Sequence, residues 1–224
     1  MKNSEAIQSY FEKLFPDPHC ELEFCTPYQM LVSVVLSAQC TDKRVNQVTK
    51  TLFKVAPDPK SMQKLETSEL ETLIKSCGFY HNKAKAIKEL TNDILQKFDG
   101  QIPNNFEDLT SLRGVGRKTA NVVLATAFDK PAFAVDTHVF RVSHRLGLSD
   151  ANTPDKCEQD LTNIFEKKDW SKTHYQMVLF GRYVCKAQKP NCPECELKNI
   201  CLYFKNKNEK NNKIKKILKF KIKN

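Results

Sequence analysis

A glycine-flanked turn followed by two cations is the stretch of this sequence with the clearest chemical potential. It consists of Gly114, Val115, Gly116, Arg117 and Lys118. Beyond it the chain is apolar on nearly every face, as in a buried helix. Glycines suit a tight turn or a close backbone approach, and the N–H groups that begin a helix attract anions. The motif therefore predicts a phosphate-binding turn between two helices.

Lys118 is the unusual member of this motif. The positive end of a helix dipole disfavours a cation in the first turn, so a lysine there needs a reason. An amine is nucleophilic only when it is neutral, and the helix end, the neighbouring Arg117 and partial burial would all favour the neutral form. The residues alone leave two hypotheses for Lys118, a solvated side chain and a reactive amine.

Four of the nine cysteines are crowded near the C-terminus with the spacing C-x6-C-x2-C-x5-C. They are Cys185, Cys192, Cys195 and Cys201. Four thiolates in so short a loop suit a metal centre. Structural zinc sites with four cysteines usually have two C-x2-C pairs, whereas iron–sulfur clusters accept more varied spacing. The spacing therefore favours an iron–sulfur cluster, with zinc as the alternative.

The other five cysteines are scattered along the chain and are expected to be small buried hydrophobes. They are Cys20, Cys25, Cys40, Cys77 and Cys157. An odd total, in a chain that shows no export signal, argues against a framework of disulfides.

The elements that must position these residues are predicted to be helices. Apolar residues recur at helical spacing between segments rich in Pro, Gly and Asp, and no segment alternates convincingly as a strand does. The predicted helices span residues 4–15, 28–37, 43–55, 67–76, 83–98 and 106–111, a helix after Gly116, and residues 136–146, 154–166 and 171–184. The expected fold class is all-α.

Positive charge is concentrated at the C-terminal end. The formal net charge is +10, but residues 205–224 hold nine Lys and one Glu, so the remainder carries only +2. We predict that 205–224 form a disordered tail; the alternative is a basic arm that adds salt-sensitive affinity for DNA. Without a membrane-spanning apolar run or a targeting segment, a cytoplasmic protein is expected.

Several segments together resemble the endonuclease III family of DNA glycosylases. They are LRGVGRKTANVV from Leu112, AVDTHVFRVSHRLG at 134–147, LSAQCTD at 36–42 and GFYHNKA at 78–84. The resemblance extends from about residue 5 to residue 204. It implies a helix-hairpin-helix element at about 106–127 and a [4Fe–4S] loop at the four C-terminal cysteines.

The resemblance also implies a mechanism. Lys118 matches the lysine that attacks C1′ of a damaged nucleotide, after which the base leaves, a Schiff base forms and β-elimination cuts the strand on the 3′ side. Asp136 matches the catalytic aspartate, which stabilises developing oxocarbenium charge or assists proton transfer. From the sequence alone Asp136 is also a typical helix N-cap, and both roles can hold at once.

Further residues are implied as DNA contacts. Gln39 and Phe79 match positions that fill the gap left when a nucleotide is extruded from the duplex, although the family often has Leu in place of Phe79. His138 is expected to have a structural or phosphate-contacting role. Arg113 stands where Pro is common, which should loosen the turn slightly and add a cation beside the phosphate site.

The resemblance implies two helical domains flanking a DNA-binding cleft. One domain spans 20–130, and the other joins 1–19 to 131–204 and holds the cluster. The implied protein is a monomeric, nucleoid-associated DNA glycosylase and AP (apurinic/apyrimidinic) lyase of base excision repair. Its substrate would be double-stranded DNA containing oxidised pyrimidines or abasic sites.

Two alternatives remain open at this point. An adenine-mismatch glycosylase shares the hairpin and the cluster, but it lacks the nucleophilic lysine and carries a large additional C-terminal domain. A non-catalytic helix-hairpin-helix protein would grip DNA phosphates alone, and it would need neither Lys118 nor Asp136.

Overall fold

The computed structural model describes residues 3–209, and this part of the chain contains helices and loops but no β-strand. The all-α prediction is confirmed. The chain divides into two compact units, of which one runs from His19 to Ala134 and the other combines the chain before His19 with the chain after Ala134. The predicted DNA-binding cleft stays a prediction. Within residues 3–209, no helix combines the length and apolarity needed to cross a membrane.

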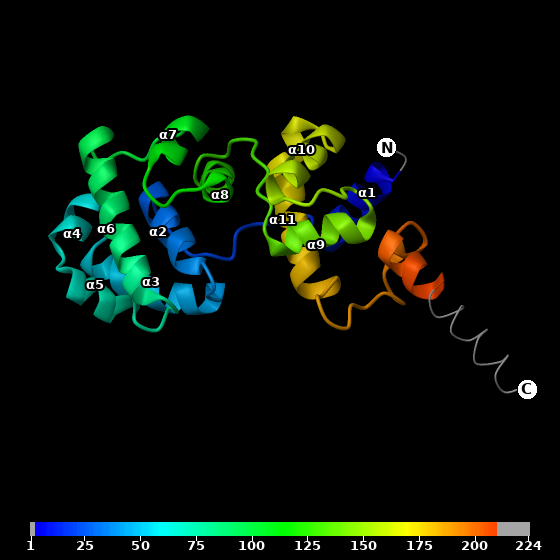
Figure 1. Ribbon diagram of the computed structural model, residues 1–224, viewed down its shortest axis with the longest axis horizontal. Helices are drawn as coiled ribbons and strands as arrows, with labels where there is room; N and C mark the ends of the chain where they lie inside the picture. The colour runs from blue at the N-terminus through cyan, green and yellow to red at the C-terminus, as the bar shows by residue number, and fades with distance from the viewer. Residues whose placement is uncertain (1–2, 210–224) are drawn as a thin grey trace, which may run out of the picture. The chain divides into compact units, whose positions relative to one another are not determined.

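The unit from His19 to Ala134 is built around one apolar helix, α2. Its helices are α2 (Pro27–Ser37), α3 (Asp42–Val55), α4 (Pro59–Lys64), α5 (Thr67–Ile74), α6 (Tyr80–Lys97), α7 (Phe106–Ser111) and α8 (Arg117–Ala127) (Figure 1). Thr26 caps α2 by accepting a hydrogen bond from the Gln29 N–H, and Pro27 occupies the first turn, where its missing N–H costs nothing. Helices α3, α6 and α8 pack against α2, which explains why α2 is apolar on nearly every face.

Helix α4 is absent from the sequence-based prediction, in which the prolines around Asp58 only end the preceding helix. In the structure Asp58 is an N-cap whose carboxylate accepts from the Ser61 N–H at 2.9 Å, while the Ser61 hydroxyl accepts from the Asp58 N–H. Pro59 occupies the first helical position. The segment thus carries a capping box, and this signal could have predicted the helix.

The second unit is arranged around helix α11. Its elements are α1 (Ser4–Leu14), α9 (Thr137–Leu146), α10 (Pro154–Ile164), η1 (Lys167–Asp169), α11 (Trp170–Leu179), η2 (Phe180–Val184) and η3 (Glu196–Asn199). Helices α1 and α9 pack against α11, and α10 packs against α9. The fully buried ring of Phe11 lies 5.1 Å from that of Phe180, measured between centroids. The four C-terminal cysteines also belong to this unit.

The predicted helix 171–184 is in fact two elements, because the α-helix changes to a π-helical turn at Phe180. Gly181 lies against α9 so closely that a Cβ there would be 2.8 Å from the Cβ of His138. Hydrophobic spacing does not distinguish an α-helix from a π-turn, so the sequence pattern missed this change. The π-turn leads directly into Cys185.

The prediction of a disordered tail over 205–224 is wrong for its first residues. Residues 202–209 are helical, so the first five residues of the predicted tail belong to a helix. The rest of that prediction, residues 210–224, lies outside the described residues.

Candidate functional site

The turn between α7 and α8 is held by two buried apolar side chains and one backbone hydrogen bond. Leu112 and Val115 are both buried, and the Val115 N–H donates to the Leu112 carbonyl at 3.1 Å. Gly114 has φ +81°, a conformation that glycine adopts without strain. Because both the side chain and the N–H of Val115 are engaged, we assign this residue to holding the turn.

Gly116 is the N-cap of α8 and has an extended backbone, so it does not need glycine's conformational freedom. A Cβ at this position would have no heavy atom within 4 Å. No side chain caps the first turn of α8, although the first N–H groups of any α-helix have no acceptor within the helix. Gly116 therefore leaves the positive end of α8 open for an anion.

Lys118 lies in the first turn of α8 and is exposed. The partial burial expected from the sequence is therefore wrong, because the apolar surface of α8 lies further along, from Ala120 to Ala125. The adjacent Arg117 places its guanidinium over the ring of Phe106, 5.0 Å from the centroid. This contact joins the two helices of the hairpin.

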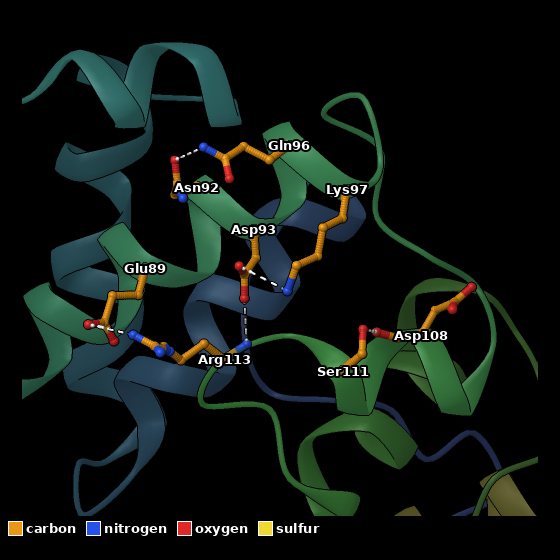
Figure 2. Close-up of polar contacts among 8 residues, drawn as sticks. All are labelled: Glu89, Asn92, Asp93, Gln96, Lys97, Asp108, Ser111 and Arg113. Atoms are coloured by element: carbon orange, nitrogen blue, oxygen red, sulfur yellow. Dashed lines mark hydrogen bonds and ion pairs between the residues drawn. The ribbon is translucent and has the colours of Figure 1, made fainter.

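Arg113 attaches the hairpin to α6 (Figure 2). Its N–H donates to Asp93 Oδ2 at 3.0 Å, and its guanidinium pairs with Glu89 at 3.3 Å. A proline at this position could not donate the first bond. The backbone of Arg113 is thus anchored to α6 and its exposed guanidinium is paired with Glu89. The expected loosening of the turn and the role of this cation beside the phosphate site stay predictions.

Asp93 also pairs with Lys97 one turn along α6, at 3.1 Å. Partial desolvation tends to raise the pKa of Asp93, but the Arg113 N–H and the Lys97 ammonium outweigh it and lower that pKa below its ordinary value. No sequence signal marks Asp93 as a partner of the turn, because twenty residues separate it from Arg113.

Gln39 and Phe79 lie on two neighbouring loops of the same unit. Both adopt the left-handed conformation, with φ 53° and 57°, which is uncommon for residues other than glycine and concentrates at functional sites. A Cβ on Gly78 would lie 3.8 Å from the Gln39 carbonyl oxygen, so the two loops meet. Phe79 is 64% exposed, which is unusual for a phenylalanine.

Asp136 is the N-cap of α9. Its Oδ1 accepts hydrogen bonds from the N–H groups of His138 and Val139, both at 2.8 Å. The N-cap prediction is therefore confirmed. Both cap bonds fall on one carboxylate oxygen, and the half-buried side chain is held in one position.

His138 lies between Asp136 and a group of arginines. Burial is the main cause that lowers its pKa, with Arg141 and Arg182 acting in the same direction and Asp136 opposing them. Its Nδ1 accepts a hydrogen bond from Arg141 at 3.3 Å, since a guanidinium can only donate. His138 is therefore expected to be neutral at neutral pH.

The four C-terminal cysteines line one cavity, which has an empty volume of about 350 Å³, part of it open to solvent. They are Cys185, Cys192, Cys195 and Cys201. Burial, followed by the proximity of the other thiols, raises the pKa of Cys192. Within residues 3–209, no three His, Cys, Asp or Glu side chains are spaced to hold a single metal ion. Four cysteines that line one cavity provide the donor set of a [4Fe–4S] cluster, in which each cysteine binds a different iron.

Two arginines of α9 donate hydrogen bonds at the beginning of the loop that contains the four cysteines. Arg141 donates to the Gly181 carbonyl at 2.8 Å, and Arg145 donates to the Lys186 carbonyl at 2.7 Å and lies 3.4 Å from Cys185 Sγ. No local sequence signal marks these arginines as hydrogen-bond donors to the loop, since more than 35 residues separate each from its partners. The loop is thus anchored by charge-assisted bonds.

Comparisons with known proteins identify the family. A model described as "HhH-GPD superfamily base excision DNA repair protein" matches residues 32–167. Endonuclease III of Bacillus subtilis (strain 168) is 46% identical over 205 residues, which cover 90% of this chain and 94% of that protein. The chain belongs to the endonuclease III family. Endonuclease III of Synechocystis sp. is 47% identical over 191 residues, covering 85% of this chain and 87% of the relative.

Solved structures of endonuclease III resemble this chain in both sequence and fold. A trapped endonuclease III–DNA covalent intermediate is 47% identical with a TM-score of 0.86, covering 89% of this chain and 94% of that one. A non-covalent endonuclease III–DNA complex is 45% identical with a TM-score of 0.89, covering 93% and 98%. This member of the endonuclease III family is a DNA glycosylase and AP lyase of base excision repair. The comparisons thus favour this enzyme over both alternatives.

Proposed function

We propose that this enzyme excises oxidised pyrimidines from double-stranded DNA and then cuts the strand 3′ to the abasic site. The observation that supports it most is the position of Lys118, exposed in the first turn of α8 beside an uncapped helix end. An amine so placed is accessible to a sugar whose phosphate is bound at that helix end.

In the proposed reaction, the neutral Nζ of Lys118 attacks C1′ of the damaged nucleotide and the base departs with a proton. The lone pair of the nitrogen then opens the sugar ring to a Schiff base. Loss of a proton from C2′ and of the 3′ phosphate cuts the strand, and hydrolysis frees Lys118. We assign to Asp136 the stabilisation of the cationic sugar and the proton transfers that follow.

The remaining assignments concern DNA binding. We propose that the N–H groups of Gly116 and Lys118 bind a phosphate, with Gly114 shaping the turn and Arg117 adding positive charge. The meeting of their two loops supports Gln39 and Phe79 as the residues that fill the gap in the duplex. His138 is assigned a structural role at the start of α9.

We assign a [4Fe–4S] cluster to Cys185, Cys192, Cys195 and Cys201. When bound, it would cross-link a loop that has little apolar core of its own. Iron and sulfide analysis of the purified protein, together with its visible absorption, tests this assignment. Stoichiometric zinc without sulfide would contradict it.

Since the relatives are bacterial proteins, we propose that the enzyme acts as a monomer in the cytoplasm, at the nucleoid. Fractionation of cells and sedimentation of the purified protein test these two statements. Recovery in a membrane fraction, or a stable dimer, would contradict them.

The catalytic assignment is tested on duplexes that carry an oxidised pyrimidine, an abasic site or no lesion. Base release and strand scission are measured separately, and borohydride trapping detects the covalent intermediate. We expect Lys118→Ala to abolish trapping, whereas the matched control Lys64→Ala, at an exposed lysine of α4, retains it. Efficient trapping by Lys118→Ala would refute the role of Lys118.

A further inference from the structure

The two loops that carry Gln39 and Phe79 each contain a cysteine beside these residues. Cys40 follows Gln39 directly, and Cys77 is separated from Phe79 only by Gly78. Both cysteines are expected from the sequence to be small buried hydrophobes, and the proposed reaction uses neither of them.

The structure brings the two thiols together. The backbones of the two loops meet at Gln39 and Gly78, and the neighbouring thiols of Cys40 and Cys77 are close enough to influence each other electrostatically. Cys77 is fully buried, whereas Cys40 is partly accessible. A pair with one accessible and one enclosed thiol is suited to stepwise oxidation.

The surroundings of Cys77 determine which of the two thiols reacts first. Burial and the neighbouring Cys40 raise the pKa of Cys77 to about 11, while the cations of Lys83 and Arg44 oppose this rise. At neutral pH Cys77 is therefore almost entirely protonated and is a poor initial nucleophile. The accessible Cys40 is the thiol that meets a reagent from solution.

We propose that Cys40 and Cys77 are a redox-sensitive pair that closes to a reversible disulfide and thereby fixes the loops of Gln39 and Phe79 to each other. The co-reactant is a low-molecular-weight disulfide. The effect on catalysis rests on the proposed function, whereas the formation of the bond does not.

The chemistry proceeds in two exchanges. Cys40, as its thiolate, attacks the small disulfide, forming a mixed disulfide and releasing one small thiol. Cys77 then loses its proton and attacks the Cys40 sulfur, which forms the Cys40–Cys77 bond and releases the second small thiol. The protein is oxidised by two electrons, the small disulfide is reduced by two, and an excess of small thiol reverses both steps.

The bond would act on the residues that enter the duplex. Filling a gap in the base stack requires Gln39 and Phe79 to adjust to the nucleotide being extruded, and a covalent link restricts this adjustment. Since misplacement of about 1 Å can cost roughly a hundredfold in rate, we expect oxidation to slow base release by about tenfold.

The test uses the full chain with its cluster intact, treated with oxidised glutathione as the probe. Peptide mapping without reduction should find the Cys40–Cys77 link, and visible absorption should show that the C-terminal cysteines are unaffected. Cys40→Ala should prevent the link. Cys25→Ala, at an exposed cysteine outside both loops, is the matched control and should form it.

Base release is then compared for reduced, oxidised and re-reduced protein. We expect the loss to appear on oxidation, to reverse with dithiothreitol and to be absent in Cys40→Ala. A mixed disulfide that stays on Cys40, or a link to another cysteine, would overturn the pairing. A correct link with unchanged base release would overturn its effect on the loops, and an inactive reduced protein would instead count against the proposed function.

Discussion

The ammonium group of Lys83 donates a 2.9 Å hydrogen bond to the carbonyl oxygen of Leu36, and both residues are buried. Leu36 lies in the last turn of α2, where carbonyl groups have no partner within the helix and where the helix dipole favours a cation. Lys83 lies in the first turn and a half of α6. The bond therefore links α2, which ends just before Gln39, to α6, which begins just after Phe79.

Replacing Lys83 by Met should remove this bond and leave a buried carbonyl unsatisfied. We expect a loss of about 1–3 kcal/mol in the free energy of unfolding, measured by denaturant titration. Lys85→Met, at an exposed position of the same helix, is the control and should change stability little. Equal stability of the two variants would show that the Lys83 bond contributes nothing.

The two glycines of the turn should respond differently to alanine. Gly114→Ala forces a side chain into the left-handed region and should cost about 1–2 kcal/mol in unfolding free energy. Gly116→Ala has an extended backbone and open space, so stability should hardly change. Its methyl group would nevertheless occupy the end of α8, and we expect weaker binding to duplex DNA.

Unfolding and DNA-binding measurements on the same two proteins separate these effects. If Gly116→Ala bound DNA as tightly as the unaltered chain, the phosphate site would not lie at this helix end.

Removing the Asp93 carboxylate with Asp93→Ala should release the turn from α6. The lowered pKa of Asp93 means that its stabilisation is present above the unfolded-state pKa of about 3.9 and is lost as pH falls through the lower folded-state pKa. We expect a cost of about 1 kcal/mol at pH 7 and a smaller one in acid. A cost that stayed constant across this range would argue against an ionised Asp93 as the cause.

His138 should titrate below the ordinary histidine value, because burial lowers its pKa. The unfolded chain then binds more protons than the folded one between the folded-state pKa and about 6.5, so stability should fall as pH decreases through that window. NMR titration of the His138 ring measures this pKa directly. A value above 6.5 would mean that Asp136 outweighs burial and the arginines.

The sequence predicted most of the helices because their signals are local. Caps such as Asp136, apolar spacing along α6 and the glycines of the turn are visible within a few residues. The missed features depend on contacts that the chain makes over long distances. Asp93 accepts a hydrogen bond from Arg113, Arg145 donates to the cysteine loop, and Gly181 lies close to His138 of α9.

The candidate site shows the same division. Spacing and resemblance located Lys118, Asp136 and the four C-terminal cysteines, whose roles stay predictions. The partial burial expected for Lys118 was wrong, because the exposure of a side chain depends on which surfaces the folded chain covers. The proximity of Cys40 and Cys77 could not be predicted, since it arises only when their two loops meet.

Because one unit is discontinuous in sequence, its parts are synthesised on the ribosome at different times. Residues 19–134 emerge as one continuous stretch and hold all the helices of their unit, so this unit can fold while synthesis continues. Helix α1 emerges earlier still, yet its partners are α11 and η3, and Lys13 pairs with Glu196 at 2.5 Å. The apolar face of α1 therefore stays uncovered until the segments that contain α11 and η3 have been synthesised.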